Sequence, residues 1–116
     1  MSFDDHKWPF EPTLFNPDGV KKPNIGVKYD QQKRRYSLLP NGVVNDVVDV
    51  LEFGARKYAV DNWKHVDNGY VRYYDAALRH IDAWHSGEQY DQDSEQHHLA
   101  HAICCLMFLL WKDKNE

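Results

Sequence analysis

The segment 102–111 constrains the fold most, because its ten successive residues are all apolar. A run of this length is about half of what a membrane-spanning helix requires. As a helix it would be apolar around most of its circumference, and such a helix is buried on most of its sides. The segment therefore has to be covered by other elements of the domain or by a second subunit. With 116 residues, the chain can build one modest core.

Three segments have the apolar periodicity of helices, about 41–58, 70–86 and 94–112. In the first two, apolar residues recur three and four positions apart, which places them on one helix face. The side chains that we expect to face the core are Val44, Val47, Val48, Leu51, Ala55 and Tyr58 in the first segment, and Val71, Tyr74, Ala77, Leu78, Ile81 and Trp84 in the second. The sequence therefore predicts an all-α fold: a small bundle of three main helices with an irregular N-terminal arm, completed by oligomerisation.

The ends of two helices have recognisable signals. Gly87 follows the second segment, where a glycine commonly ends a helix in the left-handed conformation. Asp93 and Gln96 have the spacing of a capping box, which predicts that the third helix begins directly after Asp93.

Residues 1–27 contain four of the five prolines and no sustained periodicity. This composition is typical of an irregular arm. We expect Trp8, Phe10 and Phe15 to pack onto the domain or onto a partner subunit. Residues 28–116 would then form a single helical domain.

Charge and cysteine usage exclude some functions. A net charge of −4 argues against sequence-independent binding of duplex nucleic acid, because such binding requires many cationic side chains. Cys104 and Cys105 are adjacent and lie inside the apolar run, so we expect buried thiols with a raised pKa rather than nucleophiles. The N-terminus lacks a basic and apolar leader, and together with reduced cysteines this predicts a cytoplasmic protein.

Histidines and carboxylates concentrate in residues 79–101, which hold five of the seven histidines. Because unpaired buried polar groups cost free energy, this density predicts a bound cation, a phosphate, or both. His98 and His101 are three residues apart and share a helix face, so both rings can reach one ion. The alternative is a pair of surface histidines that hydrogen-bond to the acidic loop. Nitrogen and oxygen ligands together suit Mn²⁺ or Zn²⁺, whereas Mg²⁺ prefers oxygen and water.

Two further groups could bind a substrate. A basic segment before the first helix could neutralise phosphate, although a solvated charged loop has the same composition. The residues of this segment are Lys28, Asp30, Lys33 and Arg35. At the end of the first helix, Lys57–Tyr58 and Asn62–Trp63 offer an aromatic surface and an amide, on which a nucleobase could stack. Core packing is the alternative for these aromatic rings.

Several of these motifs occur together in a specific order. They are Lys28-x-Asp30-x-x-Lys33-x-Arg35-x-x-Leu38-x-Pro40, Glu52-Phe53-Gly54-Ala55-x-Lys57-Tyr58, Asn62-Trp63, Arg79-His80, Gly87-Glu88-x-x-Asp91 and His98-Leu99-x-His101-Ala102. Over about residues 28–110, this order resembles a small phage-associated family named for the N-terminal domain of dATP/dGTP diphosphohydrolase. That family resembles the all-α MazG-type pyrophosphatases, which bind Mg²⁺ through carboxylates and cleave nucleoside triphosphates to monophosphate and pyrophosphate.

The resemblance implies an oligomeric, MazG-like enzyme, a homodimer or larger, that acts on purine deoxynucleotides in a phage-infected cell. It implies Mg²⁺ or Mn²⁺, with Zn²⁺ as an option, and a water that attacks the α-phosphorus. The implied metal ligands are Glu52, Glu88, Asp91 and His101, the implied proton acceptors are His80 and His98, and the implied phosphate-binding cations are Lys28, Lys33, Arg35 and Arg79. The chain departs from the MazG pattern because His98-x-x-His101 stands where that pattern has carboxylates.

Two other functions are open at this level. One is a non-catalytic protein that binds a nucleotide or inhibits a host protein, which the missing carboxylates favour. The other is an HD-type phosphohydrolase, which releases triphosphate or phosphate. That class requires an adjacent His–Asp pair, and the sequence contains none because Ile81 separates His80 from Asp82.

Overall fold

A computed structural model describes residues 25–116 of the chain. Trp8, Phe10 and Phe15 lie outside the described residues, so the packing of the N-terminal arm stays a prediction. The chain divides into two units between Leu38 and Leu39. In the first unit, the described residues are irregular except for a 3₁₀ helix at Tyr36–Leu38.

The second unit, Leu39–Glu116, is helical. Its elements are α1 (Val43–Lys57), a 3₁₀ helix (Asn62–His65), α2 (Gly69–His85) and α3 (His98–Asn115). No β-strand occurs among the residues that the structure describes, where an isolated bridge pairs Tyr90 with His97. The predicted all-α fold with three main helices is therefore confirmed.

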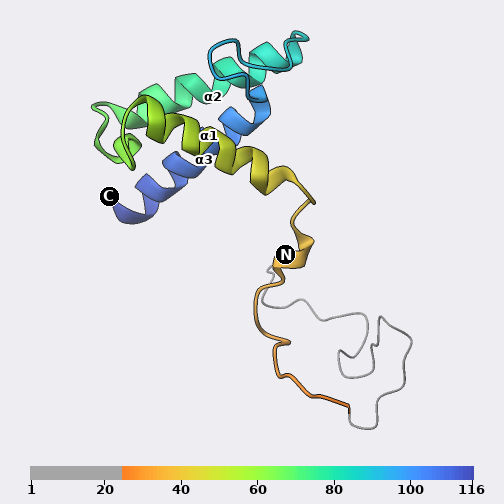
Figure 1. The fold of residues 1–116 in the computed structure, drawn as a ribbon. Coiled ribbons are helices and arrows are strands. Elements are labelled where there is room, and N and C mark those ends of the chain that lie inside the picture. Colours follow the sequence, from red (N-terminus) through yellow and green to blue (C-terminus); the bar gives the residue numbers. More distant parts are fainter. Residues whose placement is uncertain (1–24) are drawn as a thin grey trace. The chain divides into compact units, whose positions relative to one another are not determined.

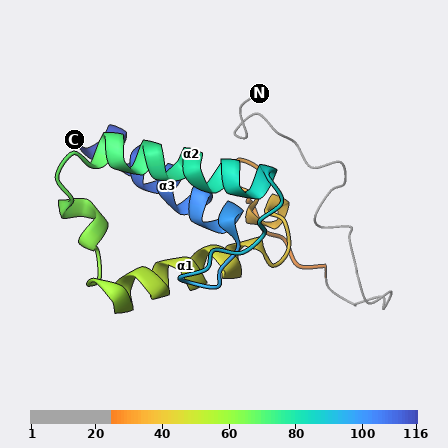
Figure 2. The same cartoon turned by 90° about the horizontal axis from the view of Figure 1, so that it is seen from above.

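Figure 2 shows helix α3 between the other two helices, and in Figure 1 α1 crosses in front of α3. Both α1 and α2 pack against α3. The core joins α1 to α3 through Val47, Val50, Ala100 and Cys104. Leu51, Ile103 and Phe108 pack around this cluster. The apolar segment 102–111 forms the centre of α3, but other elements of this chain cover it only in part, because Leu106, Met107 and Leu110 are 53%, 47% and 62% exposed. Within residues 25–116, no helix combines the length and the hydrophobicity that crossing a membrane requires.

The predicted apolar face of α1 is partly wrong. Val47 is buried as expected, but Val44 and Val48 are 47% and 41% exposed, and Val50 is buried instead. Only a narrow face of α1 contacts α3. The spacing of apolar residues around the helix does not indicate which edge of the apolar face makes that contact. Tyr58 is also exposed, because α1 ends before it.

The predicted face of α2 is wrong to a larger extent. Ala77 is buried, whereas the other predicted core residues are 39% to 61% exposed in this chain: Val71, Tyr74, Leu78, Ile81 and Trp84. The reason is the rotation of α2, which turns Tyr73, Ala77 and His80 towards α3. Helix α2 is apolar on two sides, and the periodicity alone identified the outer one.

The end of α2 is as predicted. Gly87 has a φ of 104°, and its N–H donates to the carbonyl of Trp84 at 3.0 Å. The N–H of Glu88 donates to the carbonyl of Ala83 at 3.0 Å. These paired bonds form a Schellman motif, in which the left-handed residue is most often glycine.

The predicted capping box at Asp93 is wrong. Helix α3 begins at His98, with His97 as its N-cap. The Nδ1 atom of His97 accepts a hydrogen bond from the N–H of Leu99 at 3.0 Å. Glu95 has a φ of 62°, which interrupts any helix that begins near Asp93. The loop before α3 is therefore longer than predicted and carries side chains of the candidate site.

Candidate active site

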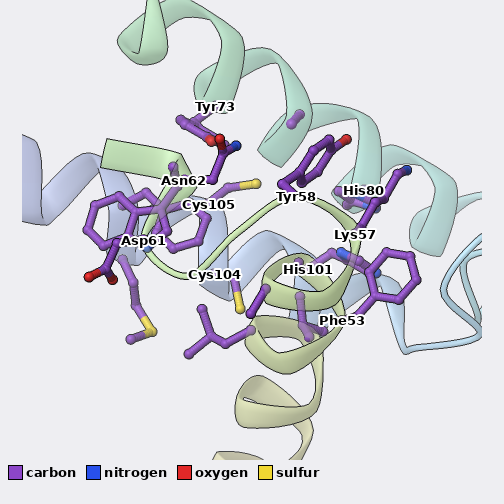
Figure 3. A pocket seen from close by; sticks show the side chains of 18 of the residues that line it. Phe53, Lys57, Tyr58, Asp61, Asn62, Tyr73, His80, His101, Cys104 and Cys105 are labelled. Carbon is purple, nitrogen blue, oxygen red and sulfur yellow. The ribbon is translucent and has the colours of Figure 1, made fainter. Parts of the chain in front are cut away.

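A cavity of about 700 Å³ opens between the end of α1, the 3₁₀ helix Asn62–His65, α2 and α3 (Figure 3). Its volume is within the range of small-molecule sites. Most of the predicted site residues line it: Lys57, Tyr58, Asn62, Trp63, Arg79, His80, Asp91 and His101. Residues far apart in the sequence thus converge on one cavity.

The cavity has two chemically different ends. Figure 3 shows Lys57, His80 and His101 towards one end and Asn62 and Tyr73 towards the other, with Tyr58 between them. One end therefore offers imidazole and ammonium groups, and the other offers an aromatic ring and an amide.

A histidine cluster lies where α2 packs against the start of α3. The Nδ1 atoms of His80 and His98 are 2.8 Å apart. The ring of His80 also stacks on that of His101, with centroids 4.5 Å apart and planes at 9°. One ligand atom each from His80, Asp91 and His98 lie within 4.8 Å of one another. The structure therefore joins residues of two helices and one loop in an arrangement that could hold a metal ion.

Asp91 is fixed by the turn that follows it. Its Oδ2 atom accepts hydrogen bonds from the N–H of Asp93 at 3.1 Å, the N–H of Ser94 at 2.8 Å and the hydroxyl of Ser94 at 3.0 Å. Burial by itself would raise the pKa of Asp91, but the two bonds from Ser94 and the nearby histidines lower it below its usual value. Asp91 is therefore a carboxylate at neutral pH.

The surroundings of the histidines keep two of them neutral. Burial, together with the neighbouring His101 and His98, lowers the pKa of His80 to about 4. Burial also lowers the pKa of His101, although Asp91 opposes the shift. Neutral imidazoles have a free lone pair, which can bind a metal ion or accept a proton.

His98 is the most buried member of the cluster, with 5% of its surface exposed. Its Nε2 atom lies 3.2 Å from Oε1 of Glu88, without the alignment of a hydrogen bond. Glu88 therefore contacts a histidine of the cluster, although the triad of converging ligand atoms does not include it. Glu52 is exposed and pairs with Arg56 at 3.8 Å, outside both the cavity lining and this triad. The roles of Glu52 and Glu88 as metal ligands stay predictions.

The phosphate-binding residues predicted from the sequence fall into two groups. Lys57 and Arg79 line the cavity, and the Nζ atom of Lys57 lies 2.7 Å from Oδ2 of Asp93. The hydrogen bond to Asp93 raises the pKa of Lys57. The other residues lie in the first unit, which is described by itself, so their role in substrate binding stays a prediction: Lys28, Asp30, Lys33 and Arg35.

Trp63 packs mainly against α3. Its ring stacks on Phe108 with centroids 4.5 Å apart, and Trp111 meets it edge-on at 5.1 Å. Tyr58, by contrast, lines the cavity and is 65% exposed. Among these aromatic side chains, Tyr58 therefore has the ring surface that a nucleobase could use.

Sequence reasoning missed several lining residues. Tyr73 lies two turns before His80 on α2, and Phe108 lies two turns after His101 on α3. A seven-residue spacing returns to nearly the same helix face, so this signal was present in the sequence. Asp93 had no such signal, because its contact with Lys57 depends on the loop conformation.

Cys104 and Cys105 line the cavity but are not suited to nucleophilic attack. Both are buried, and burial raises their pKa to about 12 and about 11, respectively. The Sγ atom of Cys104 donates to the carbonyl of Val47 at 3.5 Å. The predicted role of both cysteines as buried apolar residues is confirmed.

Comparisons with known proteins agree with the motif order. A family model described as dATP/dGTP diphosphohydrolase, N-terminal, matches residues 23–116. A dATP/dGTP diphosphohydrolase from Salmonella phage PMBT28 is 35% identical over 91 residues, which is 78% of this chain and 31% of that relative. The chain thus spans about a third of the length of this relative. No solved structure has significant similarity to the chain.

Proposed function

Because the chain belongs to the dATP/dGTP diphosphohydrolase N-terminal family, we propose that it is a metal-dependent nucleoside triphosphate diphosphohydrolase. Its substrate is a purine deoxynucleoside triphosphate, and its products are the monophosphate and pyrophosphate. The observation that carries this proposal is one cavity whose lining combines neutral histidines, a carboxylate and two cations with aromatic and amide groups. Attack of water on the α-phosphorus breaks its bond to the oxygen that bridges to the β-phosphorus and releases these two products.

The donors around His80 and Asp91 suit a divalent ion, since a fixed carboxylate lies beside neutral imidazoles. When bound, such an ion neutralises phosphate charge and lowers the pKa of a bound water. Asp91, His80, His98 and His101 are the residues available to hold it. An imidazole of this cluster that is not occupied as a ligand accepts the proton of the attacking water.

The remaining lining residues orient the nucleotide. Lys57 and Arg79 offset the charge of the phosphates, and the guanidinium of Arg79 can bind two phosphate oxygens at once. The base stacks against Tyr58, and Asn62 offers a donor and an acceptor to its edge. This orientation brings the α-phosphate towards the histidine cluster.

Product analysis tests the proposal. The protein is incubated with deoxynucleoside triphosphates and Mg²⁺, Mn²⁺ or Zn²⁺, and the products are separated by anion exchange. We expect monophosphate and pyrophosphate in equal amounts, and a large loss of turnover in Arg79→Met. Arg72→Met is the matched control, because Arg72 lies on the same helix, is exposed and is not among the cavity-lining residues. Equal loss in both variants would contradict the assigned site, and triphosphate as the product would contradict the reaction.

A second candidate function is nucleotide binding without turnover. The observation in its favour is that the chain matches only 31% of the phage relative, so the reaction could depend on the other part of that protein. Calorimetry with a non-hydrolysable triphosphate distinguishes the two functions. Stoichiometric binding together with no turnover under any metal would favour this second candidate.

We also propose that the protein acts as a homo-oligomer in the cytoplasm of an infected host and changes its nucleotide pool. The apolar residues exposed on α2 support the oligomer, since monomers rarely leave large apolar patches open. The phage origin of the relative supports the proposal that the protein acts in an infected host cell. Light scattering on the purified protein measures the mass directly, and a strictly monomeric protein would contradict the oligomer.

A further inference from the structure

We propose that His80, Asp91 and His98 bind one first-row transition-metal ion of the Zn²⁺ or Co²⁺ type in preference to Mg²⁺. This inference deepens the proposed function, because it assigns the metal of the same cavity. Two imidazoles and one carboxylate form a donor set that suits Zn²⁺ and related ions, whereas Mg²⁺ favours oxygen donors and retains its waters.

The distances agree with such a site. A tetrahedral ion with metal–nitrogen bonds of about 2.0–2.1 Å holds two ligand nitrogens about 3.4 Å apart. The Nδ1 atoms of His80 and His98 are 2.8 Å apart, so they need to separate by only about 0.6 Å. The carboxylate of Asp91 has an oxygen within 4.8 Å of both rings. Small side-chain rotations therefore suffice to form the site.

Glu88 is placed to select the tautomer of His98. Its Oε1 atom lies 3.2 Å from Nε2 of His98 without the alignment of a hydrogen bond, and a small rotation of the half-exposed Glu88 side chain would let it accept a proton carried on Nε2. With the proton there, Nδ1 of His98 has a free lone pair that points at His80. Carboxylates hold metal-binding histidines in this way in many zinc sites. Glu88 is thus a positioning residue for His98 rather than a ligand.

Asp91 is pre-organised for the same role. Three donors occupy its Oδ2 atom, and its Oδ1 atom has no hydrogen bond among residues 25–116. The turn therefore fixes the carboxylate and leaves one oxygen for an ion. His101 lies beside the triad, where its Nε2 atom is 2.6 Å from Oγ of Ser94. Three protein ligands leave a position for water or phosphate, as in catalytic zinc sites. Because the Ser94 hydroxyl donates its proton to Asp91, Nε2 of His101 donates to Ser94, and Nδ1 is the atom of His101 that can accept a proton.

Metal titration tests the inference without any activity measurement. The full chain is stripped with a chelator and then titrated with Co²⁺, Zn²⁺ and Mg²⁺ by calorimetry, and the visible absorption of Co²⁺ reports its coordination. We expect one Co²⁺ or Zn²⁺ per chain, at least a hundredfold tighter than Mg²⁺. His98→Asn and Asp91→Asn should abolish this tight binding, and Glu88→Gln should weaken it by about 10- to 100-fold.

His85→Asn is the matched control, because His85 is an exposed histidine on the same helix as His80 and does not belong to the converging triad. It should bind Co²⁺ like the unchanged protein. Circular dichroism verifies the fold of each variant, and His80→Asn replaces His98→Asn if the buried substitution prevents folding. Equal affinity for Mg²⁺ and Co²⁺, or unchanged Co²⁺ binding in folded His80→Asn and Asp91→Asn, would overturn the inference.

The inference and the proposed function can fail separately. Tight Co²⁺ binding by these residues without nucleotide hydrolysis would support the metal site and contradict the diphosphohydrolase. Pyrophosphate release with Mg²⁺ by a protein that does not bind Co²⁺ tightly would overturn the metal site and support the diphosphohydrolase.

Discussion

Replacing Asp93 by Asn is expected to tighten nucleotide binding rather than weaken it. Lys57 and Asp93 both line the cavity, and they form an ion pair of 2.7 Å between α1 and the loop before α3. A bound triphosphate competes with Asp93 for the ammonium of Lys57. Removing the carboxylate leaves this ammonium free and also removes a negative charge that faces the phosphates.

The magnitude follows from the exposure of the pair. The side chains of Lys57 and Asp93 are 44% and 65% exposed, so water and salt weaken their attraction. Exposed ion pairs have a small interaction free energy, which a bound triphosphate no longer has to overcome when Asp93 is replaced. This small free energy corresponds to a decrease of about two- to fivefold in the Kd of a non-hydrolysable triphosphate. The thermal midpoint should change little, because the pair is exposed.

A double-mutant cycle separates the two effects of Asp93. If the carboxylate acts by holding Lys57, Asp93→Asn should have no effect on Kd in the Lys57→Met background. Any improvement that remains there measures direct repulsion between Asp93 and the phosphates. Calorimetry at two salt concentrations supplies the four Kd values. An unchanged or higher Kd in Asp93→Asn alone would refute the assignment of this end of the cavity to phosphate.

Three further predictions concern other parts of the cavity. Gly54 lines the cavity, and a Cβ atom added to it meets no atom within 4 Å apart from its chain neighbours and the nearby backbone of its own helix, so Gly54→Ala should raise the free energy of unfolding by about 0.5–1 kcal/mol. Gly54→Phe should fold but lose nucleotide affinity, and equal Kd values for both variants would contradict the position of the ligand. Since burial and neighbouring histidines lower the pKa of His80 to about 4, the unfolded chain binds a proton that the folded chain resists. The metal-free protein should therefore lose stability as the pH falls from about 6.5 towards 4, and urea midpoints should depend less on pH in His80→Asn. Burial raises the pKa of Cys104 and Cys105 to about 12 and about 11, so iodoacetamide at pH 8 should modify them only in urea; rapid modification of the folded protein would argue against their burial.

Local sequence signals predicted the positions of the helices, because helix formation and the helix end at Gly87 depend mainly on residues that are close in the sequence. These signals failed where contacts between distant residues determine the structure. Asp93 is spaced like a helix cap, but the turn at Asp91 and the left-handed Glu95 delay α3 until His98. A helix that is apolar on two sides gives no sign of which side meets its neighbour, and this explains the error for α2.

The sequence indicated part of the lining of the candidate site but not its arrangement. The density of histidines pointed to residues 79–101, whereas the lining residues Tyr73, Asp93 and Phe108 were missed. The pairing of His80 with His98, however, depends on the register between α2 and α3, which no local pattern contains. The contact between Glu88 and His98 likewise depends on the turn that ends α2. Both features are required to distinguish a ligand from a positioning residue.

The two histidines of the triad affect the charge that a nucleotide meets. In a site made of carboxylates, divalent ions must first cancel the charge of their own ligands before they attract phosphate. Here the pKa of His80 and of His101 is lowered, so their neutral rings add no negative charge, and Asp91 is the single carboxylate of the triad. One divalent ion on this triad would leave a net positive charge beside Lys57 and Arg79. A single ion would then suffice to attract the triphosphate, which is why the identity of the ion and the mechanism of the proposed enzyme are coupled.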